Sequence, residues 1–153
     1  MPVSTSSERV VRGPGSFGCG SLFMAHDAAA VSGARRALVA DLRSDPATTV
    51  VADEAAVVAS ELLGNAVRHA VPLDEGDVLL RWHVRPGEVE IEVVDGGGGA
   101  PQSRDVDAMA TGGRGLRIIE VLSERWGCST DERGRRSVWA SLATTATAMA
   151  RTA

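Results

Sequence analysis

Two stretches of the chain repeat apolar residues at the spacing of an amphipathic helix. The first runs from Ala28 to about Arg43, and Asp27 stands where an N-cap residue belongs. Ser44-Asp45-Pro46 is expected to end it. The second runs from about Ala52 to Ala70, with a cap near Asp53. The pattern therefore predicts two helices that each bury one face.

Other stretches alternate apolar and polar residues, which is typical of half-buried strands. Residues 17–26 form a short apolar segment that reads as a first strand. Residues 78–84 and 89–94 are separated by a turn at 85–88, which predicts a β-hairpin. Residues 126–129 and 137–142 predict a second hairpin around the basic segment 131–136, which we interpret as a solvated turn.

The remaining segments complete the order of elements. Residues 1–16 have little to bury and are expected to form a flexible arm. Residues 102–112 are polar and predict a loop, and a third helix is expected from Leu116 to about Arg125. Residues 143–153 are expected to be a flexible tail, so the predicted domain covers residues 17–142.

Helices grouped against strands in the order β-α-α-β-β-α-β-β predict an α+β fold. We expect a two-layer α/β sandwich, in which three helices cover one face of a mixed, mostly antiparallel sheet. The chain of 153 residues is long enough for one domain with a full core.

Composition narrows the possible functions. The net charge is −4, which disfavours a nucleic-acid binder. No apolar run approaches the roughly 20 residues of a membrane span, and no signal peptide is visible. Cys19 and Cys128 match no metal spacing, so a reduced, cytoplasmic protein is expected. All 16 basic residues are arginine, which excludes every nucleotide site that needs a lysine.

The second predicted helix carries polar residues that a plain core helix does not need. Glu61, Asn65 and His69 are spaced four apart, so they share one face of the helix. That face borders the apolar stripe instead of lying opposite it. Side chains placed there can look into a cleft at the edge of the core, although a solvated helix edge would give the same pattern.

Two glycine clusters follow at places where a phosphate could approach the backbone. Asp95 stands directly at a strand end and is followed by Gly96–Gly99. Gly113 and Gly115 stand at the start of the third helix, whose dipole favours an anion. Either cluster alone could be a flexible connection. The G-x-x-x-x-G-K-[ST] loop is absent, since the chain has no lysine, and G-x-G-x-x-G is absent around both glycine clusters, so a nucleotide site here needs Asn, Asp and Gly.

These three groups resemble, in order, the boxes of the GHKL ATPases (gyrase, histidine kinases and relatives). Glu61-x-x-x-Asn65-Ala66-x-Arg68-His69 is similar to the N box, Asp95-x-Gly97-x-Gly99 to the G1 box and Gly113-x-Gly115-Leu116 to the G2 box. The resemblance covers roughly residues 20–142. It implies a sandwich of the Bergerat type that binds ATP and Mg²⁺.

The resemblance assigns roles to the residues that match the boxes. Asn65 is implied as the Mg²⁺ ligand, for which an amide oxygen is suited. Asp95 is implied to accept a hydrogen bond from the adenine amino group. Glu61 resembles the general base that activates a hydroxyl or water toward the γ-phosphate. The alternatives are a satisfied amide, a turn-forming Asp and a surface carboxylate, respectively.

Further residues are implied to line the ATP site. Arg68 is expected to touch phosphate or to be solvated or ion-paired, and His69 to serve in packing or positioning. Ser137 falls where a Ser or Thr near adenine is common. The predicted ATP-binding set is Asn65, Arg68, His69, Asp95, Gly97, Gly99, Gly113, Gly115, Leu116 and Ser137.

Within the superfamily, the chain most resembles the small anti-sigma factor serine/threonine kinases. This implies a sigma factor and an anti-anti-sigma (STAS-type) protein as partners, with a possible homodimer. The expected lid, Gln102–Gly112, carries only Arg104 as a basic residue, with Arg114 adjoining. Because phosphoryl transfer needs positive charge near the γ-phosphate, an ATP-binding module without kinase turnover is the alternative. A soluble α+β domain without a nucleotide is the third possibility.

Overall fold

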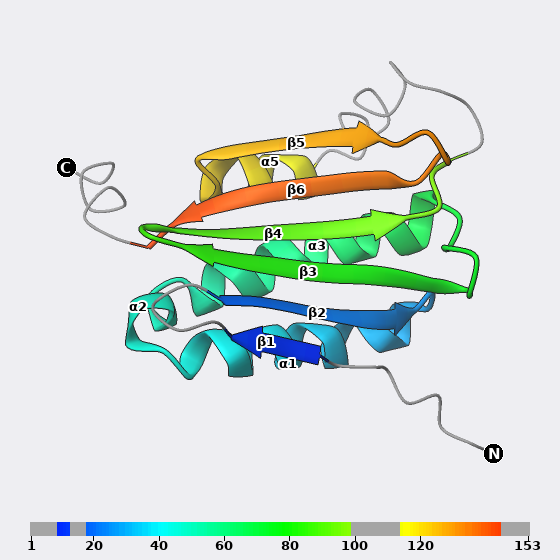
Figure 1. Ribbon diagram of the computed structural model, residues 1–153. Helices are drawn as coiled ribbons and strands as arrows, with labels where there is room; N and C mark the ends of the chain where they lie inside the picture. Colours follow the sequence, from blue (N-terminus) through cyan, green and yellow to red (C-terminus); the bar gives the residue numbers. More distant parts are fainter. Residues whose placement is uncertain (1–8, 13–17, 99–113, 145–153) are drawn as a thin grey trace.

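The computed structural model describes residues 9–12, 18–98 and 114–144. These residues form six strands and several helices (Figure 1). In chain order they are β1 (Arg9–Arg12), β2 (Gly18–Ala25), the 3-10 turn η1 (Ala28–Ala30), α1 (Val31–Arg43), α2 (Pro46–Thr49), α3 (Ala52–His69), β3 (Asp77–Arg85), β4 (Glu88–Asp95), α5 (Arg114–Leu122), β5 (Arg125–Thr130) and β6 (Arg136–Ala143).

The strands form one sheet in the order β1-β2-β3-β4-β6-β5. A mixed, mostly antiparallel sheet was expected, and every strand pair that the structure describes is antiparallel. Helices α1, α3 and α5 lie together on one face of this sheet (Figure 1). The predicted two-layer α+β sandwich is therefore confirmed.

The core lies between the sheet and these helices. Along β4, Val89, Ile91 and Val93 are buried, while the glutamates between them are half-buried on the other face. Helix α3 meets this face with the stripe that its periodicity predicted, and Leu62 and Leu63 are buried. The side chains buried at every second position of the strands therefore pack against the apolar stripes of the helices and form one core.

One large side chain ties the sheet to α1. Trp82 on β3 is completely buried, and its Nε1 donates a hydrogen bond to Oδ2 of Asp41 at 2.7 Å. Gly20 lies opposite Trp82 in the β2–β3 register, and a Cβ at that position would lie 2.2 Å from the indole ring. The neighbouring strand therefore needs a residue without a side chain so that the indole can enter the core.

The helix starts agree with the sequence in one case and differ in another. Asp27 caps the first helical turn, because its Oδ1 accepts a hydrogen bond from the backbone N–H of Ala29. The cap near Asp53 is wrong: α3 begins at Ala52 with Val51 at the N-cap. Asp53 lies in the first turn, where a carboxylate interacts favourably with the helix dipole. It also forms an ion pair with Arg43 at 2.9 Å.

Three boundaries also differ from the sequence-based expectation. A short helix, α2, follows Asp45 where we expected only the end of a helix. Helix α5 ends at Leu122 instead of near Arg125, because Ser123 bonds back to the carbonyl of Ile119 and β5 begins at Arg125. Four residues of the expected arm, 9–12, form β1 at the sheet edge. Pairing there satisfies backbone groups of β2 that would otherwise be unpaired.

Candidate functional site

The polar edge of α3 forms one side of the candidate site. Glu61 and Asn65 are half-buried beside the core stripe, whereas Arg68 and His69 are exposed. The guanidinium of Arg68 donates a hydrogen bond from Nη2 to Oδ1 of Asn65 at 3.1 Å. The amide oxygen that was predicted to hold Mg²⁺ therefore faces outward, with a cation beside it.

The end of α3 is joined directly to the end of β4. The backbone N–H of Val71 donates to the carbonyl of Gly97 at 2.9 Å, and the N–H of Gly96 donates to the carbonyl of Val71 at 2.8 Å. The structure thus brings the predicted N box and the start of the predicted G1 box side by side, although 26 positions separate Val71 from Gly97 in the chain. In Figure 1, the last turn of α3 and the C-terminal end of β4 lie at the same end of the sheet.

Helix α3 is held at this end by a histidine from another element. His26 follows β2, and its Nε2 lies 3.0 Å from the carbonyl of Ala66 and 2.9 Å from that of Ala70. Ala66 lies in the last turn of α3, where its carbonyl also accepts from the backbone N–H of Ala70, and Ala70 is the residue after the helix. His26 therefore fixes the helix end that carries Arg68 and His69.

Asp95 is buried at the C-terminal end of β4, with only 1% of its surface exposed. It has the same parity along the strand as Val89, Ile91 and Val93, so its side chain lies on the helix-covered face. Its Oδ1 accepts a hydrogen bond from the backbone N–H of Gly97 at 2.7 Å. This contact orders the turn after the strand.

The glycines after Asp95 are required by close packing. Gly97 has a φ of +82°, and a Cβ there would lie 2.4 Å from the carbonyl oxygen of Gly134 in the β5–β6 turn. At Gly96, a Cβ would lie 2.2 Å from the carbonyl oxygen of Pro72. These two glycines therefore let three chain segments meet at the site, a role separate from the predicted approach of a phosphate.

Arg136 is the residue that the sequence analysis missed. It lies opposite Asp95 in the β4–β6 register, is 5% exposed, and donates a hydrogen bond from Nη2 to Oδ2 of Asp95 at 3.1 Å. We had placed it in a solvated turn. A signal was available, because Val138, Ala140 and Leu142 are apolar and period-two counting back from them places Arg136 on the buried face.

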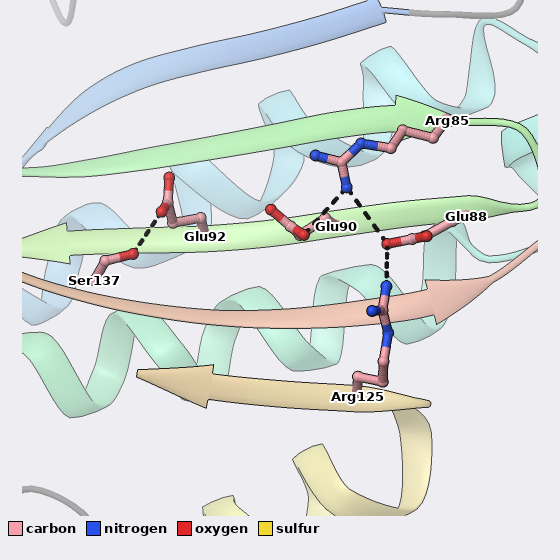
Figure 2. Close-up of polar contacts among 6 residues, drawn as sticks. All are labelled: Arg85, Glu88, Glu90, Glu92, Arg125 and Ser137. Carbon is pink, nitrogen blue, oxygen red and sulfur yellow. Dashed lines mark hydrogen bonds and ion pairs between the residues drawn. The ribbon is translucent and has the colours of Figure 1, made fainter. Parts of the chain in front are cut away.

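Ser137 lies on the opposite face of the sheet from Asp95. Its hydroxyl donates a hydrogen bond to Oε2 of Glu92 on the face of the sheet that none of the described helices covers, called the uncovered face below, as Figure 2 shows. Consecutive residues of a strand point to opposite faces, so Ser137 lies on the other face from the buried carboxylate, whereas Arg136 shares its face. The structure does not bring Ser137 together with the other predicted site residues.

The second glycine cluster is described only in part. Gly115 and Leu116 lie in the first turn of α5, whose first residue is Arg114. Helix α5 packs against α3, and Ile119 is completely buried between the layers. Gly99, Gly113 and the expected lid at 102–112 lie outside the described residues. The backbone of α5 is thus placed beside the helix that carries Asn65.

The part of the chain that the structure describes has no group of three His, Cys, Asp or Glu side chains arranged to hold a metal ion. Mg²⁺ in nucleotide sites is commonly held by one or two side chains together with the phosphates, and Asn65 provides such an oxygen. Among the described helices, none has the length and apolar character that would let it cross a membrane.

These features define a class of protein: an α+β sandwich with an Asn-bearing helix beside a buried strand-end Asp. Residues 24–142 match the family described as the histidine kinase-like ATPase domain. Because the match covers more than half of the chain, this protein belongs to that family. The membership supports ATP binding as the function of the site. A search of the curated proteins finds no match to the chain.

Proposed function

We propose that this protein is an Mg²⁺-ATP-binding regulatory protein that acts as a serine/threonine kinase of the anti-sigma factor type. Its partners would be a sigma factor and a STAS-type anti-anti-sigma protein, the latter accepting the phosphoryl group. One observation carries the proposal: the backbone hydrogen bonds of Val71 with Gly97 and Gly96 join the end of α3 to the turn that follows buried Asp95. The three boxes, in this order along the chain, also support the proposal.

The residues at the end of α3 fit a magnesium nucleotide. Asn65 offers an amide oxygen at the half-buried edge of the helix, and its neighbour Arg68 is exposed and able to turn outward. Once turned, its guanidinium is free to meet phosphate oxygens, for which its planar donors are suited. Bound Mg²⁺ would neutralise phosphate charge during transfer.

The position of Glu61, one helical turn before Asn65, supports a role in proton transfer. It is half-buried, and its carboxylate lies on the same face of α3. In the proposed reaction, a Ser or Thr hydroxyl of the partner attacks the γ-phosphorus as Glu61 takes its proton. The bond from the γ-phosphorus to the bridging oxygen breaks, and ADP leaves.

A second function, an ATP-binding module without turnover, is favoured by the scarcity of positive charge. The segment 102–112 contains one arginine, Arg104, and Arg68 is engaged with Asn65. Phosphoryl transfer relies on cationic groups at the γ-phosphate. In this alternative, ATP stabilises one conformation that a partner protein recognises.

Binding and transfer are separated by one substitution and a matched control. We expect wild type to bind Mg²⁺-ATP saturably in calorimetry and to label a STAS-type partner from the same genome with the γ-phosphate. Glu61→Ala should keep binding and lower labelling by about a hundredfold or more, the usual contribution of a general base. Glu54→Ala, the same change in the first turn of α3, should leave both unchanged.

Each outcome selects one function. Saturable binding without labelling of any such partner supports the binding module and rejects the kinase. Labelling that survives Glu61→Ala rejects Glu61 as the base. Absence of Mg²⁺-ATP binding to wild type at millimolar nucleotide rejects both functions.

A further inference from the structure

We propose that Arg136 sets the base selectivity of the nucleotide site by competing with the base for Asp95. The inference rests on the proposed function, because it concerns the same site. Its consequence is that wild type distinguishes a 6-aminopurine from a 6-oxopurine only weakly.

The geometry places the guanidinium where a base donor would have to bind. Oδ2 of Asp95 accepts from Nη2 of Arg136 at 3.1 Å, while Oδ1 accepts from the N–H of Gly97 at 2.7 Å. The side chains of Arg136 and Asp95 are only 6% and 1% exposed. Both carboxylate oxygens of Asp95 are therefore already used within the protein, and water is nearly excluded from the pair.

The register of the sheet makes this contact a fixed feature. Asp95 and Arg136 are direct partners across β4 and β6, both on the helix-covered face. Gly97 and Gly134 meet just beyond them, so the two strand ends are also held together after the pair. A Ser or Thr at position 136 would carry no charge, which makes the charge of Arg136 decisive.

The two purine types present opposite hydrogen-bonding groups at position 6. Adenine offers an amino donor, which a carboxylate accepts, whereas hypoxanthine and guanine offer a carbonyl oxygen. A carboxylate alone disfavours that carbonyl. Arg136 changes this balance in two ways: it occupies one acceptor position of Oδ2 and balances the charge of the carboxylate, which weakens its attraction for the amino group, and its guanidinium is a donor for a 6-carbonyl oxygen.

Selectivity is measured as the ratio of dissociation constants for Mg²⁺-ITP and Mg²⁺-ATP, which differ at position 6 of the base. We expect comparable affinities for the two nucleotides in wild type. Arg136→Thr should raise the ratio of the ITP to the ATP dissociation constant by about tenfold, so that ATP is preferred, which is the effect of one hydrogen bond to a charged group. The matched control is Arg135→Thr, because Arg135 is exposed and bonds to Asp131 instead of Asp95. It should leave the ratio unchanged.

Because Arg136→Thr leaves a buried carboxylate without this cation, a second variant covers the case in which it does not fold. Arg136→Gln keeps much of the side-chain length and one amide donor but removes the charge, and it should shift the ratio in the same direction. The ratio in wild type needs no variant at all.

The outcomes separate this inference from the proposed function. A wild type that already prefers ATP over ITP by tenfold or more, or a preference that neither Arg136 variant changes, overturns the role of Arg136 while ATP binding stands. If neither nucleotide binds to wild type or to any variant, the proposed function itself fails.

Discussion

Strand β4 carries carboxylates on both of its faces, and the ion pairs on the two faces differ in their exposure to solvent. On the helix-covered face, the side chains of Arg136 and Asp95 are 6% and 1% exposed. On the uncovered face, those of Arg85 and Glu90 are 50% and 21% exposed at a similar separation of 3.3 Å. Figure 2 shows this second set, in which Arg85 and Arg125 share Glu88.

The difference shows that distance alone does not determine what an ion pair does. Water screens the exposed pairs, so each contributes about 0–1 kcal/mol and any of them can be exchanged at little cost. Asp95 is almost completely buried, so removing Arg136 takes a cation away from a carboxylate that water cannot readily solvate. The uncovered face tolerates change, whereas the buried pair constrains both the stability and the chemistry of the site.

The largest expected effect comes from breaking the buried pair. Arg136→Ala should lower the free energy of unfolding by about 3–5 kcal/mol, because Asp95 remains buried without this cation. Urea denaturation measures the loss. Arg85→Ala on the uncovered face is the control and should cost no more than about 1 kcal/mol. Equal losses in the two variants would show that burial does not distinguish the two faces.

A smaller loss is expected from crowding the strand ends at the buried pair. Gly97→Ala combines a φ of +82° with a Cβ position 2.4 Å from the carbonyl oxygen of Gly134. Together, strain and overpacking should lower the free energy of unfolding by roughly 2–4 kcal/mol.

Gly76→Ala separates the two causes. Gly76 has the same φ of +82°, but a Cβ there meets nothing within 4 Å. This control should lose only the conformational part, about 1–2 kcal/mol. If both alanine variants lose the same free energy, the contact between Gly97 and Gly134 is not tight in solution.

The smallest effect is expected at the exposed β5–β6 turn, as a dependence on pH. The Arg135 guanidinium, hydrogen-bonded to Asp131, lowers the pKa of that carboxyl below its ordinary value of 3.8, and backbone N–H groups of Arg133 and Arg135 add to this. A carboxyl with a lowered pKa stabilises the folded state above the unfolded pKa. That contribution is lost as the pH falls below 3.8 through the folded pKa.

Asp131→Asn tests this effect, because Asn keeps one oxygen that accepts from the backbone N–H groups and removes the charge, together with the second oxygen that accepts from Arg135 Nε. Wild type should have the higher thermal midpoint at neutral pH, and the difference should vanish at pH values well below 3.8. A difference that persists in acid would assign the effect to shape instead of charge.

Local patterns in the sequence were sufficient for most of the fold. A short apolar segment predicted β2, strand patterns on either side of a turn predicted both hairpins, and the apolar stripes predicted α1, α3 and the start region of α5. Strand β1 was missed because its stability comes from pairing with β2 at a sheet edge and not from an apolar pattern of its own. The predicted cap of α3, Asp53, comes two residues after the observed N-cap, Val51. The sequence gives no sign of this N-cap, because no side chain forms a capping hydrogen bond there.

The candidate site was predictable where its residues lie on one element. Glu61 and Asn65 were placed together by helical spacing, and both lie half-buried on α3 as expected. The errors concern residues 136 and 137. Both were interpreted from their residue type, without asking which face of the strand each position occupies. Arg136 was assigned to solvent and is buried, whereas Ser137 was assigned to the base site and bonds to Glu92 on the other face. The binding roles of the site residues stay predictions.

The sequence by itself determined the fold class, the edge of α3 that carries Asn65, and the position of Asp95 at a strand end. These properties follow from periodicity and from residues a few positions apart. Only the tertiary structure decided that Val71 bonds to Gly97 and that Arg136 faces Asp95. Those contacts depend on which strands become neighbours, and that choice is made by burying the faces of several distant elements in one core.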